Sequence, residues 1–193
     1  MNLPNKLTIL RIAMIPLFVA VVFISAIPFR FMIGAVLFAL AAITDTLDGQ
    51  IARKRNLVTD FGKLFDPLAD KVFVVSALIS LLCLTPDGGW KVAFAVAVMI
   101  IIAREFLVTS LRLLVAGKGI VVAAGMMGKI KTTVQMISII VILIEKQFAA
   151  ELTEFMGFPH IIGYSLMAVA VIATLISGVQ YMLAYKSYID PQK

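Results

Sequence analysis

Long apolar runs alternate with short polar segments along the chain, and this alternation predicts helices that cross a membrane. A bilayer requires about 20 residues per spanning helix, so the shorter runs must extend into their polar flanks. The breaks contain proline, glycine or clustered charges and are too short for domain linkers. The runs cover residues 12–27, 31–44, 72–85, 90–103, 134–144 and 161–184. We therefore expect an all-α integral membrane protein, a bundle of six transmembrane helices within residues 12–186 that forms a single domain over residues 1–193.

Residues 1–11 have an amphipathic pattern instead of a uniformly apolar one. Leu3, Leu7 and Leu10 fall on one face of a helix, and polar side chains occupy the other faces. This pattern predicts an N-terminal interfacial amphipathic helix that lies at the membrane surface before the first span. A cleavable signal peptide is the alternative interpretation, because basic residues precede an apolar run; the several spans that follow argue against it.

The composition supports a membrane protein and excludes other classes. Of 193 residues, 62% are hydrophobic and 15% are charged, and the mean hydropathy is +1.05. Such a chain could not cover itself with polar groups in water, which excludes soluble, disordered and fibrous proteins. The single cysteine, Cys83, excludes an intrachain disulfide and a cysteine-based zinc site. The single histidine, His160, lies beside Pro159 in a predicted loop and is expected at the surface.

Basic residues are concentrated in alternate loops, and this asymmetry predicts the orientation in the membrane. The net charge of +6 is explained better by topology and anionic lipid than by a nucleic-acid partner. One set of loops and ends holds Lys6, Arg11, Arg53, Lys54, Arg55, Lys63, Lys118, Lys129, Lys131, Lys186 and Lys193. The other set holds only Arg30, Lys91 and Lys146. Since cytoplasmic loops are the more basic, we expect both termini on the cytoplasmic side of the cell membrane.

Four aspartates interrupt the apolar pattern at predicted membrane boundaries. Asp45 and Asp48 follow the second run, and Asp66 and Asp70 precede the third. At about 100° per residue, the members of each pair lie roughly 60° and roughly 40° apart on their helices, so each pair shares a face. Antiparallel helices joined by the short segment 53–62 would bring the two pairs together.

Bound cations are the simplest way to make this cluster of carboxylates stable. Like charges repel, and a carboxylate at the bilayer centre costs about 2.5–3.5 kcal/mol on insertion scales. Oxygen ligands without Cys or His favour a hard ion such as Mg²⁺, Mn²⁺ or Ca²⁺, and four carboxylates can bridge two of them. The alternative is that the acids are solvated or form ion pairs with nearby cations. Those cations are Arg53, Lys54, Arg55, Lys63 and Lys71.

Small residues accompany the aspartates and leave a slot beside the predicted ions. Gly49 and Ala52 follow Asp48, and Gly62 precedes Asp66 by one helical turn. Close packing of helices through small residues is an equally open explanation for each of them alone. Arg53 adds a cation that could bind a phosphate in a bidentate manner.

The whole segment resembles the signature of the CDP-alcohol phosphatidyltransferase family. It consists of Asp45-x-x-Asp48-Gly49-x-x-Ala52-Arg53, eight further residues, and Gly62-x-x-x-Asp66-x-x-x-Asp70. Every position of the signature is matched, so the resemblance is specific. It implies a six-helix membrane enzyme that commonly forms homodimers and carries two Mg²⁺ or Mn²⁺ ions. Such an enzyme moves a phosphatidyl or similar group from a CDP-linked donor to an alcohol and releases CMP.

The resemblance also implies roles for individual residues. Asp45, Asp48, Asp66 and Asp70 resemble the metal ligands, and Asp70 resembles the proton acceptor. The residues that resemble the binding site for the CDP part of CDP-diacylglycerol are Gly49, Ala52, Arg53, Thr59 and Gly62. The N-terminal pattern Pro4-Asn5-x-x-Thr8-x-x-Arg11 is also similar to the family, and Asn5 and Thr8 would help to cap the nucleotide site. On the sequence alone, Asn5 and Thr8 are equally well explained as residues at a helix start.

A second group of charged residues bears on the acceptor. Arg104, Arg112, Lys129 and Lys131 lie at predicted cytoplasmic ends of spans, where four cations would make a receptor for a phosphate dianion. With Glu105, this group is similar to the phosphatidylglycerophosphate synthases of the family, which implies sn-glycerol 3-phosphate as acceptor in the synthesis of anionic phospholipid. The alternative for the cations is the ordinary positive-inside bias.

Other functions remain open on the sequence. Within the family, the acceptor could be an inositol phosphate, serine or phosphatidylglycerol. From a different class, a divalent-cation transporter could also place four acids among helices, although its carboxylates would be expected near the middle of the bilayer. A set of acids at span ends beside cations favours the transferase.

Overall fold

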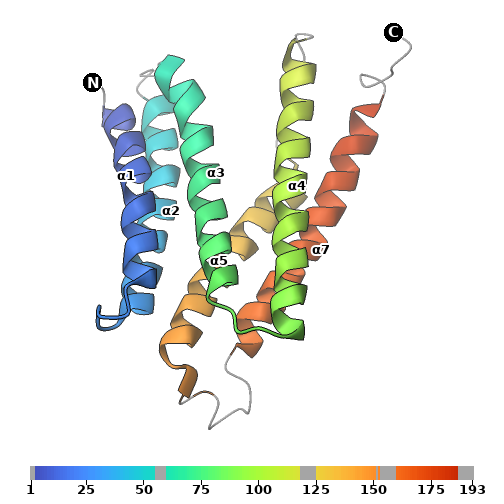
Figure 1. Ribbon diagram of the computed structural model, residues 1–193. Helices are drawn as coiled ribbons and strands as arrows, with labels where there is room; N and C mark the ends of the chain where they lie inside the picture. The colour runs from blue at the N-terminus through green and yellow to red at the C-terminus, as the bar shows by residue number, and fades with distance from the viewer. Residues whose placement is uncertain (1–2, 55–59, 118–124, 151, 153–159, 187–193) are drawn as a thin grey trace. The chain divides into compact units, whose positions relative to one another are not determined.

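The computed structural model describes residues 3–54, 60–117, 125–150, 152 and 160–186 (Figure 1). Inside the helices, the side chains of residues 3–5, 45–54, 60–64, 66, 67 and 117 are outside this description. The described helices are α1 (Leu3–Phe23), α2 (Arg30–Lys54), α3 (Asp60–Cys83), α4 (Gly89–Gly117), α5 (Met126–Gln147) and α7 (Ile161–Ala184). Over the described residues the secondary structure is helical, without strands, which confirms the all-α prediction.

Four of these helices are long and apolar enough to cross a membrane, which indicates a multi-pass membrane protein. The apolar segments are Lys6–Phe23, Gly89–Ala116, Met126–Gln147 and Ile161–Ala184, and a shorter one is Arg30–Thr44. The number of six spans stays a prediction. At the N-terminus, α1 continues from the predicted interfacial helix into the first predicted span as far as Phe23, because no helix-breaking residue separates the two segments.

The chain forms two compact units, which we describe separately. Unit 1 consists of Met1–Leu84 and Ile139–Gly163, and unit 2 consists of Thr85–Ser138 and Tyr164–Lys193. The helix α5 contributes residues to both units, its C-terminal part to unit 1 and its N-terminal part to unit 2.

The core of unit 1 is formed where α1 packs against α2 and α3. One phenylalanine from each helix lies at its centre: Phe18, Phe38 and Phe73 are almost completely buried. Their ring centroids are 6.2, 5.6 and 5.3 Å apart, within the range in which aromatic pairs contribute about 0.5–1.5 kcal/mol beyond the area they bury. These contacts hold the three helices that begin or end beside the predicted acidic site.

Gly34 of α2 marks a close approach to α1. A Cβ atom at this position would lie 2.7 Å from Cγ2 of Val22, a β-branched side chain that is fully buried and has little freedom to move. We expect Gly34→Ala to reduce the free energy of unfolding by about 1–3 kcal/mol, the usual cost of overpacking a core. Thermal unfolding in detergent measures this change.

Gly89→Ala is the matched control, because a Cβ atom at Gly89 would meet no atom within 4 Å. Its unfolding temperature should equal that of the wild type. Equal unfolding temperatures for both variants would contradict the close packing of α1 on α2.

Two neighbouring residues of α5 bind the ends of other helices in unit 1. The carboxylate of buried Glu145 accepts hydrogen bonds from the backbone N–H groups of Ile162 at 3.1 Å and Gly163 at 3.1–3.2 Å, in the first turn of α7. A carboxylate there satisfies donors that have no partner within the helix. Nζ of Lys146 donates to the carbonyl oxygen of Leu84, just after α3, at 3.0 Å.

His160 lies beside Glu145, with Nδ1 4.0 Å from Oε2 of the carboxylate. Its side chain is only 12% exposed, so the expectation of a surface residue was wrong. The position in a loop suggested exposure, but the carboxylate that binds the first turn of α7 draws the preceding residue inward.

In unit 2, α4 and α7 lie side by side (Figure 1), and polar contacts between them define their register. Near the N-terminal end of both helices, Tyr164 stacks with Trp90 and contacts Phe94, with ring centroids 5.9 and 5.6 Å apart. The hydroxyl of Tyr164 lies 3.5 Å from Oγ1 of Thr85. Towards the other end, charged and hydroxyl groups join the aromatic rings of Tyr181 and Tyr185.

Candidate active site

The predicted acidic site belongs to the adjoining ends of α2 and α3. Asp45 and Asp48 lie near the C-terminal end of α2, and Asp66 and Asp70 lie near the N-terminal end of α3. In unit 1, α2 runs towards one end of the unit and α3 runs back from it (Figure 1). The helical backbone therefore gives each pair the shared face that the spacing of three and four residues predicts.

Most side chains of this predicted site are outside the described residues. Thr59 lies in an undescribed segment, and the undescribed side chains are those of Asn5, Asp45, Asp48, Gly49, Ala52, Arg53, Gly62 and Asp66. For these residues the structure gives the helix and the register, and the roles stay predictions.

Asp70 is described, and it lies at the edge of the core of unit 1. Its side chain is partly exposed, while the neighbouring Ala69 is buried and Phe73, one turn later, belongs to the aromatic core. The packing of α3 therefore fixes the helix on which Asp70 is placed. As a donor set, four carboxylates on two helix faces fit a hard divalent cation, which prefers oxygen ligands.

Two residues of α1 are buried in the same unit, and both belong to the N-terminal pattern noted in the sequence. Thr8 is fully buried and Arg11 is 2% exposed, and their separation of three residues puts them on one face of α1. From the sequence, Arg11 is a member of this pattern and a predicted cytoplasmic cation, without a role of its own. Its burial indicates a specific role, because a buried guanidinium is tolerated only where other groups compensate its charge.

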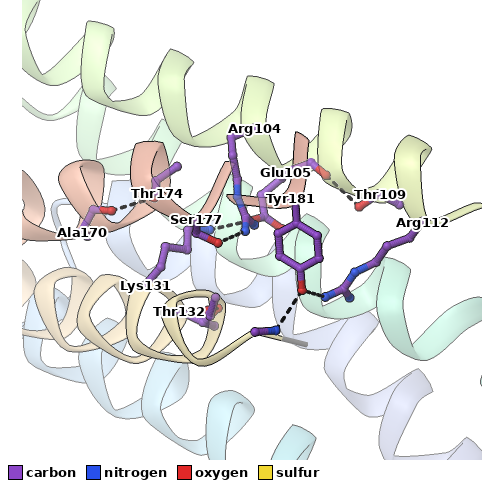
Figure 2. Close-up of polar contacts among 12 residues, drawn as sticks. Arg104, Glu105, Thr109, Arg112, Lys131, Thr132, Ala170, Thr174, Ser177 and Tyr181 are labelled. Atoms are coloured by element: carbon purple, nitrogen blue, oxygen red, sulfur yellow. Dashed lines mark hydrogen bonds and ion pairs between the residues drawn. The ribbon is translucent and has the colours of Figure 1, made fainter. Parts of the chain in front are cut away.

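A second polar cluster, in unit 2, contains three of the four cations predicted to bind the acceptor (Figure 2). Oε1 of Glu105 accepts hydrogen bonds from Nη1 of Arg104 at 2.9 Å and from Nζ of Lys131 at 2.5 Å. The other terminal nitrogen of Arg104, Nη2, donates to Oγ of Ser177 at 2.5 Å. Lys131 is almost completely buried, with 3% of its side chain exposed. We call these residues, together with Arg112 and Tyr181, the unit 2 network.

Tyr181 of α7 is the point at which the two arginines of the unit 2 network meet (Figure 2). Its hydroxyl oxygen accepts hydrogen bonds from Nη2 of Arg112 at 2.5 Å and from the backbone N–H of Gly125 at 3.1 Å. The guanidinium carbons of Arg112 and Arg104 lie 5.1 and 5.7 Å from the centre of its ring, in the range of cation–π interactions. The ring of Tyr185 also stacks on that of Tyr181, with ring centroids 6.3 Å apart.

The unit 2 network has an excess of positive charge, and it contains hydrogen-bond donors without an acceptor among the described residues. Arg104, Arg112 and Lys131 are opposed by the single carboxylate of Glu105, which leaves about two positive charges among these four side chains. Nε of Arg104 and Nε of Arg112 are buried and have no hydrogen-bond acceptor among the residues that the structure describes. A buried donor without a partner costs about 1–3 kcal/mol, so an added anion that supplies oxygen atoms would be favoured.

The structure thus brings together Arg104, Arg112 and Lys131 of the predicted acceptor residues, and it places Lys129 differently. Lys129 is exposed in the first turn of α5, and no contact described for the unit 2 network includes it. Lys129 and Lys131 are two residues apart on one helix, so they point to different faces.

The contribution of α7 was not predicted from the sequence, in which residues 161–184 indicated only a membrane span. Ser177 and Tyr181 are four residues apart and therefore share the face that meets α4. A signal was present, since polar side chains inside an apolar span usually face other helices. Gly178 lies between them, and a Cβ atom there would lie 3.3 Å from Cγ of Arg104, which shows how closely α7 approaches α4.

Comparison with known proteins gives consistent matches over nearly the whole chain. Residues 1–179 match the family model of the CDP-alcohol phosphatidyltransferases. A protein of Bacillus subtilis (strain 168) is 43% identical over 191 residues, which cover 93% of each chain. A protein of Rickettsia bellii (strain RML369-C) is 38% identical over 187 residues, which cover 97% of each chain. A protein of Salmonella typhimurium (strain LT2) is 38% identical over 187 residues, 95% of this chain and 94% of its own. All three are named CDP-diacylglycerol--glycerol-3-phosphate 3-phosphatidyltransferase.

Proposed function

The chain belongs to the CDP-alcohol phosphatidyltransferase family, and on that premise we propose that it transfers the phosphatidyl group of CDP-diacylglycerol to sn-glycerol 3-phosphate. The products are phosphatidylglycerol phosphate and CMP. The observation that carries this proposal is the identity of 37–43% to relatives named for this reaction, over more than nine tenths of both chains. The chain is accordingly a membrane-bound enzyme of phospholipid synthesis.

The ends of α2 and α3 in unit 1 form the donor site of this proposal. Asp45, Asp48, Asp66 and Asp70 would hold two divalent cations, Mg²⁺ or Mn²⁺, because the donor set consists only of carboxylates. Bound there, such ions supply positive charge to the pyrophosphate and to CMP as it leaves. CDP-diacylglycerol would be bound by Asn5, Thr8, Gly49, Ala52, Arg53, Thr59 and Gly62. The burial of Thr8 on α1, which packs against α2 and α3, supports its inclusion.

Asp70 is proposed to accept the proton of the attacking hydroxyl. The oxygen of glycerol 3-phosphate forms a bond to the phosphorus of the phosphatidyl group, while the bond from that phosphorus to the oxygen of CMP breaks. The hydroxyl proton passes to a carboxylate oxygen of Asp70. An aspartate is a weak base for an alcohol, so orientation must contribute, and general base catalysis usually accounts for about 10²–10⁴ of a rate enhancement.

The unit 2 network forms the acceptor site of this proposal. Arg104, Arg112 and Lys131 provide the positive charge that a phosphate dianion requires, and the unsatisfied Nε–H groups of the arginines provide donors. Lys129 remains in the proposal as an exposed cation at the start of α5. Serine, which lacks a phosphate, would gain little from this arrangement.

Membrane position and assembly follow from the sequence and the resemblance. We place both termini and the acidic ends of α2 and α3 on the cytoplasmic side, because the basic residues gather there. Six spans and a homodimer belong to the same proposal. The acyl chains of the donor would then stay in lipid while CDP faces the cytoplasm.

A panel of acceptors tests the proposed function directly. Purified protein in mixed micelles receives CDP-diacylglycerol, Mg²⁺ and one labelled acceptor: glycerol 3-phosphate, inositol phosphate, serine or phosphatidylglycerol. We expect release of CMP and formation of labelled lipid with glycerol 3-phosphate at least tenfold faster than with any other acceptor. Faster reaction with another acceptor would change the assignment within the family. Uptake of divalent metal by liposomes without release of CMP would instead indicate a transporter.

A further inference from the structure

We propose that Tyr181 of α7 is a positioning residue that sets the affinity for the acceptor by holding Arg112 in place. This inference rests on the proposed function, because it assumes that the unit 2 network binds the phosphate of glycerol 3-phosphate. It concerns a residue that no motif of the sequence indicated. The side chain acts through Arg112 and need not touch the substrate.

The contacts of Tyr181 fix the guanidinium group of Arg112 in two ways. The hydroxyl oxygen accepts a hydrogen bond from Nη2 at 2.5 Å, and the ring lies 5.1 Å from the guanidinium carbon. Both contacts are made to the same guanidinium group, one through the hydroxyl and one through the ring, so they restrict its position beside Tyr181. The buried Nε of Arg112, which lacks an acceptor among the described residues, is thereby kept available for an oxygen of the ligand.

The same tyrosine joins three helices of unit 2. It lies on α7, it binds Arg112 of α4, and its hydroxyl also accepts the N–H of Gly125, immediately before α5. Ser177, one turn earlier on α7, holds Arg104 in the corresponding manner. The two hydroxyls of α7 therefore hold the two arginines of α4, which lie eight residues apart, about two turns along the helix and about 80° around it.

Tyr181 lies two residues beyond the segment that matches the family model, which is residues 1–179. The inference therefore depends on the contacts of Tyr181 with Arg112, and no family motif contributes to it.

The first test is Tyr181→Phe, which removes the hydroxyl and keeps the ring. Loss of a hydrogen bond to a charged group should raise KM for glycerol 3-phosphate about tenfold, while kcat and KM for CDP-diacylglycerol change less than twofold. Tyr164→Phe is the matched control on the same helix, because its hydroxyl lies near Thr85 at the opposite end of unit 2. Its kinetic constants should equal those of the wild type.

The second test asks whether Tyr181 acts through Arg112. In the background of Arg112→Ala, the further change Tyr181→Phe should leave KM for the acceptor unchanged within twofold, because the partner is already absent. A binding measurement covers variants that are too slow to assay. Inorganic phosphate, without divalent cations, should raise the unfolding temperature of the wild type and of Tyr164→Phe, and this increase should be smaller in Tyr181→Phe and absent in Arg112→Ala.

The outcomes separate this inference from the proposed function. If the wild type does not use glycerol 3-phosphate, the proposed function fails and the inference fails with it. If the wild type does use it, an unchanged acceptor KM in Tyr181→Phe overturns the inference alone. Equal increases in both KM values, or additive effects of Tyr181→Phe and Arg112→Ala, would also overturn it, because they indicate a general structural role.

Discussion

Asp70→Asn is expected to lower the turnover of CDP-diacylglycerol and glycerol 3-phosphate by about 10²–10⁴ or more, since the amide can neither accept the proton nor carry the negative charge of a metal ligand. Donor binding should fall much less, because the three other aspartates and the CDP-binding residues remain. The measurements are the rate of CMP release at saturating substrates and the equilibrium binding of CDP-diacylglycerol. Asparagine has nearly the same shape as aspartate, so the packing around Ala69 and Phe73 should be retained.

Asp87→Asn provides the matched control for the same chemical change. Asp87 lies in the segment between α3 and α4, where the hydrogen bond from Lys91 and its positive charge lower the pKa of the carboxyl group below its ordinary value. The pair is exposed to solvent, so its loss should alter neither activity nor stability measurably. Activity of Asp70→Asn within threefold of the wild type would remove Asp70 from the proposed mechanism.

Complete removal of divalent cations is expected to abolish the release of CMP, and Mg²⁺ or Mn²⁺ should restore it. Four carboxylates at the ends of α2 and α3 would repel a pyrophosphate, which carries the same sign of charge, unless cations lie between them. The experiment combines dialysis against a chelator with titration of each metal, and it measures both activity and bound metal. About two ions per chain are expected.

The metal prediction has its own control. Binding of about two Mn²⁺ ions should be reduced in Asp45→Asn and Asp66→Asn and preserved in Asp87→Asn. Full turnover after exhaustive chelation would contradict the assignment of the acidic site, whatever the fate of the acceptor site.

The sequence predicted where helices form better than where they end. The apolar run 31–44 marks a helix that continues as α2 to Lys54, and the run 90–103 marks one that continues as α4 to Gly117. Hydropathy reports which residues prefer lipid, whereas a helix continues wherever its backbone and side chains remain satisfied. In α4 the two arginines beyond residue 103 donate hydrogen bonds to Ser177 and Tyr181, so the helix does not need to stop at them.

In the candidate site, too, relations between residues on one helix could be predicted, and contacts between residues far apart in the sequence could not. Asp45 and Asp48, or Asp66 and Asp70, are related by spacing on one helix, and such a relation can be calculated from the sequence. Arg104 and Ser177 are 73 residues apart, and Arg112 and Tyr181 are 69 apart, so only the packing of α4 against α7 brings them together. Resemblance to a family supplied the roles of the acids, and the motifs that carry this resemblance do not include Tyr181.

The adjacent residues Glu145 and Lys146 restrict the changes of sequence and length that α5 can accept. Their side chains project in directions about 100° apart and bind two different helix ends. Together these contacts fix the rotation of α5 about its own axis. A single residue inserted or deleted just before Glu145 would rotate both side chains by about 100°. Glu145 would then lose the N–H donors of α7, and Lys146 would lose the carbonyl oxygen of Leu84. Homologous enzymes should therefore vary this helix by substitution and accommodate changes of length in the loops on either side of it.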